Sequence, residues 1–333
     1  MTAVADKDLL ALTGTNVPSS CYRGTHFRLE GLLGQGSHGV TFLARREPGE
    51  STPLCVLKLL RPRAIRQLAG LAGAVVAKEV AALERLSERS PPVRHVVRFL
   101  DAGVLRIGES ALELPWLAME YVNGGDEGTS LRARVESSIR RTGHAFTAQR
   151  ALGAVSAMLA GVSAIHELGM VHRDITPGNV LCSGSEADEL FKIADFGLAR
   201  VAEVATYGNV LLGTPGYCAP EQSFPDKVGV GTYSDVFGLG ASIYYLLTGA
   251  HYLNAQSIPE TLVLAYGNER PSLCAATALS EQLRAAPELT RELDRVLAAA
   301  TTGNPLARTQ TVHELEAELL PVLRAASGQA PRG

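Results

Sequence analysis

Two stretches decide the fold that we expect, HRDITPGNVL at residues 172–181 and KIADFG at residues 192–197. A carboxylate such as that of Asp174 can accept the proton of a nearby hydroxyl group. The carboxylate of Asp195 and the amide oxygen of Asn179 are hard ligands of the kind that suits Mg²⁺, which keeps waters and substrate phosphates as its other partners. If two strand-flanked loops bring these side chains together, the combination indicates phosphoryl transfer.

A third motif, APE at residues 219–221, follows these two stretches. The ordered set of His-Arg-Asp with Asn five positions after the Asp, then Asp-Phe-Gly, then Ala-Pro-Glu, resembles the eukaryotic-type Ser/Thr protein kinases. The motifs agree in order and separation from about Gly34 to Arg308, and the Ala- and Arg-rich composition resembles bacterial members. The resemblance implies an α+β, two-lobed protein-kinase fold. The smaller lobe would hold an antiparallel β-sheet and one helix, and the larger lobe would be mainly helical.

The composition is that of an ordinary globular protein and argues against several partners. The chain has 333 residues, of which 46% are hydrophobic, and a net charge of −3. Without a strong basic field we expect no nucleic-acid partner. Apolar stretches are interrupted before about 18 residues, and the N-terminus makes a poor signal peptide, so we expect no membrane span and a cytoplasmic location. The five cysteines lack paired spacing, which favours reduced thiols over a disulfide framework or a zinc site.

The expected domain organisation follows from the motifs and from the polar ends of the chain. Residues 1–25 contain two glycines and a proline and are expected to form a flexible N-terminal arm. The small lobe is expected over residues 26–122 and the large lobe over residues 123–324. Residues 325–333 are expected to be a C-terminal tail.

The glycine-rich stretch GQGSHG, residues 34–39, lies between two strand-like patterns. A dinucleotide-binding motif would be followed at once by a helix, whereas residues 40–44 continue as a strand, so we favour a hairpin. Glycines allow a backbone to lie close over phosphates. The resemblance assigns nucleotide contacts in this hairpin to Gly34, Gln35, Gly36, Ser37 and Gly39.

Lys58 interrupts the apolar strand LCVLKLL, residues 54–60. A buried cation without a partner is costly, although a lysine at the edge of a sheet remains the alternative. By resemblance this lysine holds the α- and β-phosphates of ATP and pairs with a glutamate of the next helix. That helix is predicted over residues 64–89, and Glu79 is the better candidate because Glu84 and Glu88 look solvated.

By resemblance the adenine of ATP lies beside Thr41, Val56, Met119, Glu120, Val122 and Leu181. Met119 would guard the back of the pocket, with plain packing as the alternative, while Glu120 and Val122 would offer backbone groups to the base. Thr41 stands where the family has a valine and Val56 where it has an alanine. These departures predict a pocket that is more polar at one edge and tighter at another, with weaker ATP binding.

In the catalytic loop the resemblance assigns the role of base to Asp174, and Mg²⁺ binding to Asn179 and Asp195. His172 is a second candidate base, but structural packing against Phe196 is the preferred interpretation. Thr176 stands where most Ser/Thr kinases have a lysine that contacts the γ-phosphate, which predicts weaker stabilisation of the transition state.

The segment after Gly197 carries the hydroxyl groups that could be modified. We predict activating phosphorylation at Thr206, for which autophosphorylation is one route. Arg173 suggests a site that an anion on this segment can order. Thr214 resembles the family threonine that contacts the catalytic loop. The Gly-Thr-x-x-Tyr-x-Ala-Pro-Glu arrangement at residues 213–221 favours Ser/Thr over Tyr substrates. We also expect a buried ion pair between Glu221 and Arg308.

Two further elements of the larger lobe carry charged residues. Asp235 enters an apolar helix, and by resemblance it anchors the catalytic loop. The helix expected over residues 130–141 carries Arg132, Arg134, Arg140 and Arg141. Such a row of charges is usually a solvated face, although it could receive an acidic partner.

The main functional hypothesis is an ATP- and Mg²⁺-dependent Ser/Thr protein kinase acting on protein substrates. One alternative is a pseudokinase that binds a partner through the same fold. Retention of Lys58, Glu79, Asp174, Asn179 and Asp195 together argues against it. A small-molecule phosphotransferase is a third possibility, but it would not need residues 213–221, a segment suited to seating a peptide.

Overall fold

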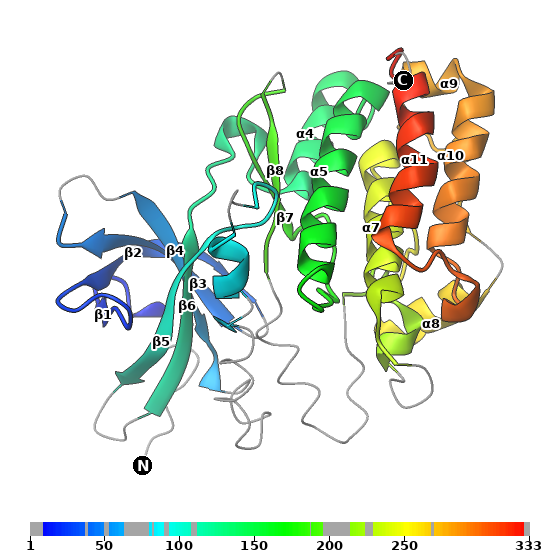
Figure 1. Ribbon diagram of the computed structural model, residues 1–333. Coiled ribbons are helices and arrows are strands. Elements are labelled where there is room, and N and C mark those ends of the chain that lie inside the picture. Colours follow the sequence, from blue (N-terminus) through cyan, green and yellow to red (C-terminus); the bar gives the residue numbers. More distant parts are fainter. Residues whose placement is uncertain are drawn as a thin grey trace. The chain divides into compact units, whose positions relative to one another are not determined.

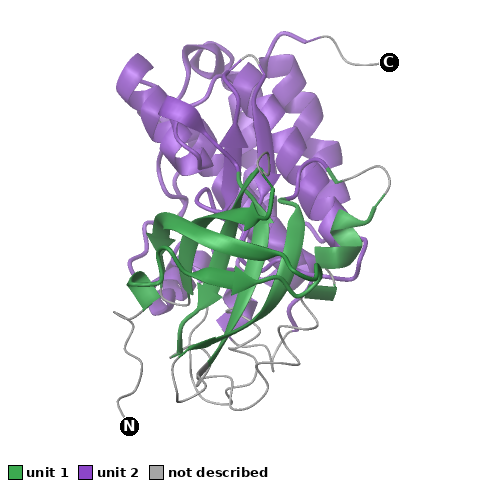
Figure 2. Ribbon diagram, turned by 90° about the vertical axis from the view of Figure 1, so that its left-hand side faces the viewer, with its two compact units in different colours: residues 1–93, 97–121, 197–210 green, residues 94–96, 122–196, 211–333 purple. Residues whose placement is uncertain are grey.

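The computed structural model describes residues 9–36, 39–49, 53–62, 80–81, 83–89, 93–107, 112–186, 188–195, 214–223, 229–267 and 270–329. The chain divides into two compact units, which Figure 2 shows in different colours. Unit 1 comprises residues 1–93, 97–121 and 197–210. Unit 2 comprises residues 94–96, 122–196 and 211–333.

Unit 1 contains a six-stranded antiparallel sheet with the strand order β1-β2-β3-β4-β6-β5 (Figure 1). The strands are β1 Asn16–Pro18, β2 His26–Gln35, β3 Gly39–Glu47, β4 Leu54–Leu60, β5 Phe99–Ile107 and β6 Leu112–Glu120. Within β3 and β4, apolar residues that are fully buried alternate with less buried ones. Because successive side chains point to opposite faces of a sheet, this alternation assigns one face to the core and leaves the other for function.

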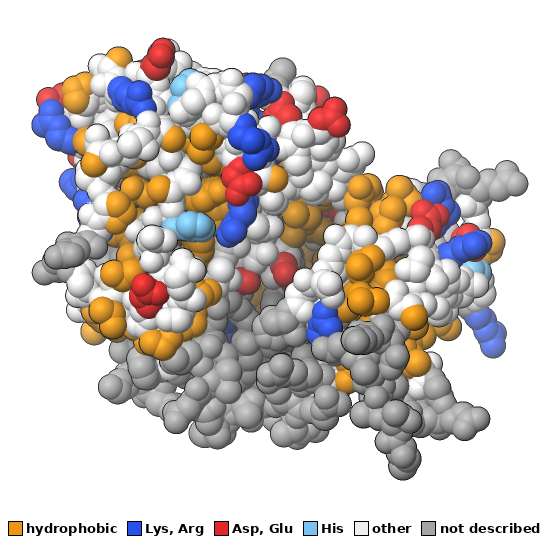
Figure 3. All heavy atoms as spheres, turned by 180° about the vertical axis from the view of Figure 1, so that it is seen from behind, with side chains coloured by type: hydrophobic (Ala, Val, Ile, Leu, Met, Phe, Trp, Pro, Cys, Tyr) orange, Lys and Arg blue, Asp and Glu red, His pale blue; other side chains and the backbone are white. Residues whose placement is uncertain are grey.

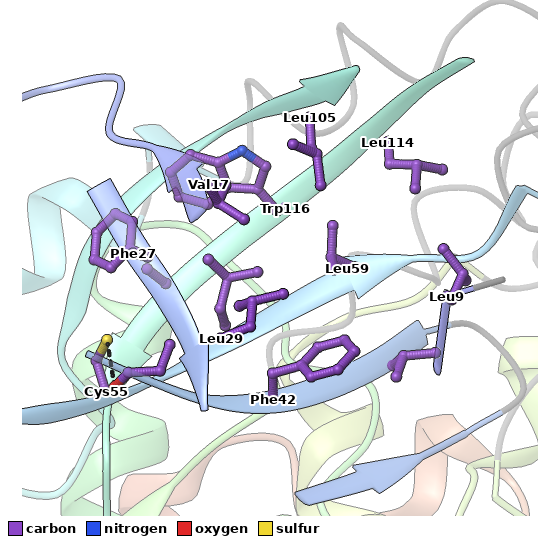
Figure 4. Close-up of a cluster of buried hydrophobic side chains, with 14 residues drawn as sticks. Leu9, Val17, Phe27, Leu29, Phe42, Cys55, Leu59, Leu105, Leu114 and Trp116 are labelled. Atoms are coloured by element: carbon purple, nitrogen blue, oxygen red, sulfur yellow. Dashed lines mark hydrogen bonds between the residues drawn. The ribbon is translucent and has the colours of Figure 1, made fainter. Parts of the chain in front are cut away.

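The core of unit 1 lies on one face of this sheet, as Figure 4 shows. Phe27 and Trp116 make an edge-on ring contact with centroids 5.5 Å apart. The Cys55 thiol donates a hydrogen bond of 3.4 Å to the carbonyl oxygen of Ala44 on the neighbouring strand. Leu9 and Val17, from before β2, are fully buried in the same cluster.

The flexible arm predicted for residues 1–25 differs from the structure over residues 9–18. Asn16–Pro18 forms β1, which pairs with β2, and the Gly14 amide donates to the carbonyl oxygen of Leu29 at 2.7 Å. The physical reason is that Leu9 and Val17 cover apolar side chains on the core face of the sheet. Residues 1–8 lie outside the described part of the chain.

The helix predicted over residues 64–89 falls mostly outside the described residues. Within it, residues 80–81 and 83–87 are helical, and Leu83 and Leu86 are buried. This burial agrees with the predicted apolar stripe of the helix.

Unit 2 is mainly helical and includes a small hairpin. The helices are α4 Leu131–Thr142, α5 Ala148–His166, α7 Thr232–Thr248, α8 Ile258–Tyr266, α9 Glu281–Arg284, α10 Pro287–Ala300 and α11 Val312–Ala326. The hairpin consists of β7 Val180–Ser183 and β8 Leu190–Ile193. Helices α4, α5 and α11 begin where sequence signals place a start, because Ser130, Thr147 and Thr311 each accept a hydrogen bond from a backbone amide of the first turn.

Helices α5 and α7 form the centre of unit 2 and are apolar along most of their length. Helix α5 has the length and composition of a membrane span, but 72% of its most apolar 18-residue window is buried within the structure. That burial is what the core helix of a globular unit requires. In the face shown in Figure 3, basic and acidic side chains are interspersed, in keeping with the small net charge.

Candidate active site

The loop that carries Asp174 is anchored to the start of α7 by a buried carboxylate. Asp235 is 1% exposed, and its two oxygens accept hydrogen bonds from the backbone amides of His172 at 2.7 Å and Arg173 at 2.6 Å. The ring of His166 contacts the same carboxylate at 2.8 Å. Arg173 has a backbone φ of 66°, an unusual value for a residue other than glycine. The paired bonds to Asp235 hold this conformation, so the anchoring role expected for Asp235 is present in the structure.

His172 acts as a structural support beneath the loop. The ring is buried, Nε2 lies 3.1 Å from the carbonyl oxygen of Ala194, and Nδ1 lies 3.3 Å from the amide of Asp174. The neutral ring with its proton on Nε2 satisfies both contacts, because it donates to the carbonyl and accepts from the amide. Burial lowers the pKa of His172, which favours this neutral form. Phe196, its predicted packing partner, lies outside the described residues.

Both oxygens of the Asp174 carboxylate are held by neighbouring side chains. Oδ1 accepts the hydroxyl of Thr214 at 2.8 Å, and Oδ2 accepts the amide nitrogen of Asn179 at 2.9 Å. The same amide nitrogen donates to the backbone carbonyl of Asp174 at 2.9 Å. The carboxylate therefore has a defined orientation, and the remaining amide oxygen of Asn179 is the group suited to a cation.

The β7–β8 hairpin brings the two candidate magnesium ligands to the same end of a strand pair. Val180 at the start of β7 pairs with Ile193 at the end of β8. Asn179, directly before Val180, and Asp195, two residues after Ile193, therefore extend from the same end of the hairpin. The amide of Ala194 donates to the carbonyl oxygen of Asn179 at 2.8 Å, which ties the two loops together. Asp195 has a φ of 60°, a second unusual backbone conformation in this loop pair. One carboxylate and one amide oxygen fit Mg²⁺, which fills its other positions with water and phosphate.

Thr176 lies in the turn between Asp174 and Asn179. It is 4% exposed, and its carbonyl oxygen accepts the amide of Asn179 at 3.0 Å. The position therefore shapes the loop, and its side chain is buried.

In unit 1 the predicted nucleotide-contacting side chains share one face of the sheet. Thr41 pairs with Lys58 between β3 and β4, and Val56 pairs with Met119 between β4 and β6. All four are partly buried, whereas their strand neighbours Phe42, Ala44, Leu57 and Ala118 are in the core on the opposite face. The register thus groups these residues on the non-core face, as the resemblance requires.

The glycine-rich hairpin contains one glycine that the close packing of backbones demands. A Cβ on Gly39 would lie 2.8 Å from the carbonyl oxygen of Leu59, closer than side chains tolerate. At the start of the turn, Arg61 donates to the carbonyl oxygen of Gly36 at 2.8 Å and to the side chain of Gln35 at 3.3 Å. Gly34 pairs with Thr41, and Gln35, opposite Val40, ends the paired part of β2. Ser37 lies outside the described residues.

The structure does not test the roles predicted for Glu79, Glu120, Val122 and Leu181. Glu79 lies outside the described residues, so its ion pair with Lys58 stays a prediction. The Glu120 amide donates to the carbonyl oxygen of Arg98 at 2.9 Å, and the Glu120 carboxylate accepts the Arg98 amide at 2.8 Å. Val122 is buried in unit 2, and Leu181 lies in β7 of that unit.

The predicted ion pair between Glu221 and Arg308 is confirmed. Two nitrogen–oxygen contacts of 2.7 Å and 3.0 Å join the groups, both of which are at most 3% exposed. Ser234 donates a further hydrogen bond of 2.7 Å to Glu221, and the Arg308 guanidinium lies 5.0 Å from the ring centre of Phe237. The pair joins the segment after Thr214 to the segment that precedes α11.

Sequence reasoning missed a second buried charge network, which fixes the segment following Val122. Arg134, expected on a solvated face, is fully buried and contacts Glu189 at 2.5 Å. Its other nitrogens donate to the carbonyl oxygens of Gly124, Gly128 and Gly184 at 2.9–3.0 Å. The sequence offered only an indirect signal for this burial. An arginine close to glycine-rich loops can donate to several backbone carbonyl oxygens with its five N–H groups.

Most of the chain matches a known protein family. A family model of the protein kinase domain matches residues 27–318. The chain belongs to the protein kinase family. Among curated relatives of this family, the serine/threonine-protein kinase PknB of Mycobacterium tuberculosis is 32% identical over 225 residues, covering 66% of this chain and 32% of PknB. The serine/threonine-protein kinase PksC of Streptomyces coelicolor is 31% identical over 314 residues, covering 92% of this chain and 50% of PksC. The chain thus spans half or less of the length of these kinases.

Solved structures confirm the predicted fold class. The kinase domain of Mycobacterium tuberculosis PknI, in a double-mutant form, superposes with a TM-score of 0.64 at 21% identity. The match covers 97% of this chain and 100% of that domain. The α+β protein-kinase fold, with a sheet-rich N-terminal region and a helical C-terminal region, is therefore confirmed, as is the similarity to bacterial members.

Proposed function

We propose that this chain is an ATP- and Mg²⁺-dependent Ser/Thr protein kinase with Asp174 as the catalytic base. The observation that carries the proposal is the double restraint on the Asp174 carboxylate by Thr214 and Asn179. In the proposed reaction the carboxylate accepts the proton of a serine or threonine hydroxyl. The hydroxyl oxygen forms a bond to the γ-phosphorus, the bond from that phosphorus to the β,γ-bridging oxygen breaks, and ADP leaves.

Asn179 and Asp195 would hold the metal ion in this reaction. Mg²⁺ would supply positive charge that neutralises the phosphate oxygens as charge shifts between them. The β7–β8 hairpin supports this role, because it brings the two residues to the same end of one strand pair.

Lys58 and its neighbours on unit 1 would bind the nucleotide. Lys58, Thr41, Val56 and Met119 share the face of the sheet opposite the core. The Thr41 hydroxyl and the larger Val56 side chain are expected to weaken ATP binding compared with a valine and an alanine at these positions.

Two other functions make different use of the same fold. A pseudokinase would bind a partner without phosphoryl transfer, and it would have no need of the restraints on Asp174. A small-molecule phosphotransferase would not need residues 214–221. Thr214 ties this segment to the catalytic loop, and so does Gln222 directly after it, whose side chain donates to the Arg173 carbonyl oxygen at 2.9 Å. Protein substrates are therefore favoured.

A thermal-shift titration combined with one radiolabelled phosphate assay separates these functions. The active kinase is expected to gain stability with ATP and further with Mg²⁺, and to label a protein carrying serine and threonine. Stabilisation without any labelled protein would support the pseudokinase. Label found only on small molecules would support the third function.

Thr206 is our proposed site of activating phosphorylation, with the chain itself as one possible source of the phosphate. The residue lies outside the described part of the chain, and the support is its place in the segment between the second and third motifs. Mass spectrometry of active protein is expected to find phosphate on Thr206, and Thr206→Ala is expected to lower the rate. An unmodified Thr206 in active protein, with full rate for the variant, would contradict the assignment. The cytoplasmic location also stays a prediction from sequence.

A further inference from the structure

A cluster of aromatic and charged side chains lies beside the catalytic loop in unit 2. We define the Arg132 cluster as Arg132 and Glu136 of α4, Tyr217, Tyr245 of α7, and His251. Tyr217 and Tyr245 are each 3% exposed, whereas Glu136 and His251 are exposed at the edge. The cluster thus has a buried part, formed by the two tyrosines, and an exposed part, formed by Glu136 and His251.

Aromatic rings form the wall of this cluster. The Tyr217 hydroxyl is hydrogen-bonded to Nδ1 of His251 at 2.8 Å, with ring centres 5.6 Å apart. The Tyr245 ring centre lies 5.4 Å from that of His251, and the Tyr245 hydroxyl donates to Glu136 at 3.5 Å. Burial is the main cause that lowers the pKa of His251, and the charge of Arg132 lowers it further, so the wall stays uncharged near pH 7.

Arg132 has unused hydrogen-bonding capacity. Its Nε atom is buried and has no hydrogen-bond partner among the described residues. Leaving a buried donor unsatisfied costs about 1–3 kcal/mol, more for a charged group. Arg134, two residues further along α4, by contrast uses Nε, Nη1 and Nη2 in hydrogen bonds with carbonyls and a carboxylate. Arg132 as a whole is partly exposed, so a ligand can approach the rest of its side chain even though Nε itself is buried.

The cluster is connected directly to the loop that holds the proposed base. The backbone amide of Arg132 donates to the carbonyl oxygen of Pro177 at 3.0 Å, between Asp174 and Asn179 in sequence. On the other side, the Tyr217 amide donates to the carbonyl oxygen of Thr214, also at 3.0 Å. Since the Thr214 hydroxyl binds Asp174, a group bound at Arg132 would lie near the acceptor hydroxyl.

We propose that the Arg132 cluster is a specificity subsite for an aspartate or glutamate of the protein substrate, close in sequence to its Ser/Thr acceptor. The inference rests on the proposed kinase function and names its substrate class. A guanidinium group can bind a carboxylate with two parallel, charge-assisted hydrogen bonds, and partial exclusion of water strengthens them. Glu136, one helical turn from Arg132, opposes a second anion and so favours a single acidic residue.

The test measures kcat/KM for a set of peptides around one serine or threonine. At each position from four before to four after the acceptor, a glutamate peptide is compared with its glutamine counterpart. Wild-type protein is expected to prefer glutamate at one position or more by about five- to tenfold, the size of one charge-assisted hydrogen bond at a partly exposed site. Arg132→Gln should lose this preference while its rate on the neutral peptide is kept.

Matched variants separate the subsite from a general effect of charge or folding. Arg140→Gln removes an exposed arginine from the last turn of α4 and is expected to keep the preference. Arg132→Lys keeps the positive charge but lacks the planar guanidinium group, so it should retain part of the preference for glutamate. This variant also tests the proposal if Arg132→Gln does not fold. Equal rates on glutamate and glutamine peptides for wild type, or an undiminished preference in Arg132→Gln, would overturn the proposal.

Binding measurements distinguish a failure of this subsite from a failure of the kinase function. If wild-type protein phosphorylates no peptide, the proposed function fails, and fluorescence anisotropy with alanine-acceptor peptides then tests the subsite alone. Tighter binding of glutamate than glutamine peptides, lost in Arg132→Gln, would support it. Equal binding of both peptides would rule it out.

Discussion

The hydroxyl of Thr214 donates a hydrogen bond of 2.8 Å to Oδ1 of Asp174, although the two residues are 40 positions apart in sequence. Asn179 holds the other oxygen of the same carboxylate. Thr214 precedes the segment that ends at the Glu221–Arg308 pair, so the orientation of the proposed base depends on how that segment is seated.

Removal of the Thr214 hydroxyl is predicted to lower kcat more than it lowers stability. In Thr214→Ala the carboxylate loses one of its two restraints, and misorientation of a catalytic group can cost up to about a hundredfold in rate. Thr214→Ser keeps the hydroxyl and should recover most of the activity. Steady-state phosphorylation kinetics provide the measurement, and full activity of the alanine variant would show that the bond has no catalytic role.

Breaking the buried pair between Glu221 and Arg308 is predicted to destabilise unit 2. Glu221→Gln leaves the Arg308 guanidinium buried without a counter-charge, which typically costs about 3–5 kcal/mol. Glu292→Gln removes an exposed partner of Arg295 on α10 and is expected to change stability little. Chemical denaturation of both variants gives the comparison, and similar unfolding free energies would contradict the buried role of the pair.

Protonation of His172 is predicted to lower the free energy of unfolding at acidic pH. Its pKa is lowered in the folded protein by burial, so below the ordinary value of 6.5 the unfolded chain binds more protons than the folded one. The free energy of unfolding should therefore fall as the pH drops from about 7 toward 5. Protonation of Nδ1 would also remove the acceptor for the Asp174 amide.

Denaturation curves across this pH range measure the effect. His172→Gln removes the titrating ring and should show a shallower dependence than wild type. His313→Gln, which removes an exposed histidine from α11, controls for the loss of a histidine as such. If the His172 variant retains the wild-type slope, another group is responsible.

Loss of the Asp235 carboxylate is predicted to loosen the catalytic loop at His172 and Arg173. Asp235→Asn keeps one oxygen but cannot accept both the His172 and Arg173 amides as a carboxylate does. One buried charge-assisted contact is lost, at a cost of about 1.5–3 kcal/mol. Hydrogen exchange should show faster exchange at these two amides than in wild type, and unchanged protection would argue against the anchor.

The parts of the fold that could be predicted from sequence are those in which local signals agree with packing. The sequence predicts that Thr147 caps the start of α5 and that Gly169 closes the helix. The Thr147 side chain caps the helix, and Gly169 has a left-handed backbone conformation. The strand predicted around Lys58, residues 54–60, is strand β4. Residues 9–18 escaped prediction because Leu9 and Val17 are buried by partners distant in sequence, which a polar local composition conceals.

Charged residues of α4 show why the rest of the site could not be predicted. Arg134 and Arg132 look alike in sequence, two positions apart on one helix. Arg134 is enclosed because Glu189 and three glycine carbonyls converge on it from other segments. Arg132 lies near Tyr217 and His251, and only the tertiary structure reveals its buried, unsatisfied Nε atom.

The proposed role of Asp174 is to promote phosphoryl transfer from ATP to a hydroxyl, and its most direct test is the rate of label transfer from γ-labelled ATP. Asp174→Asn is predicted to abolish transfer while the unfolding transition and ATP-dependent thermal shift remain. Asp188→Asn, in the exposed turn between β7 and β8, is predicted to leave the rate unchanged. Transfer by folded Asp174→Asn at the wild-type rate would contradict this role.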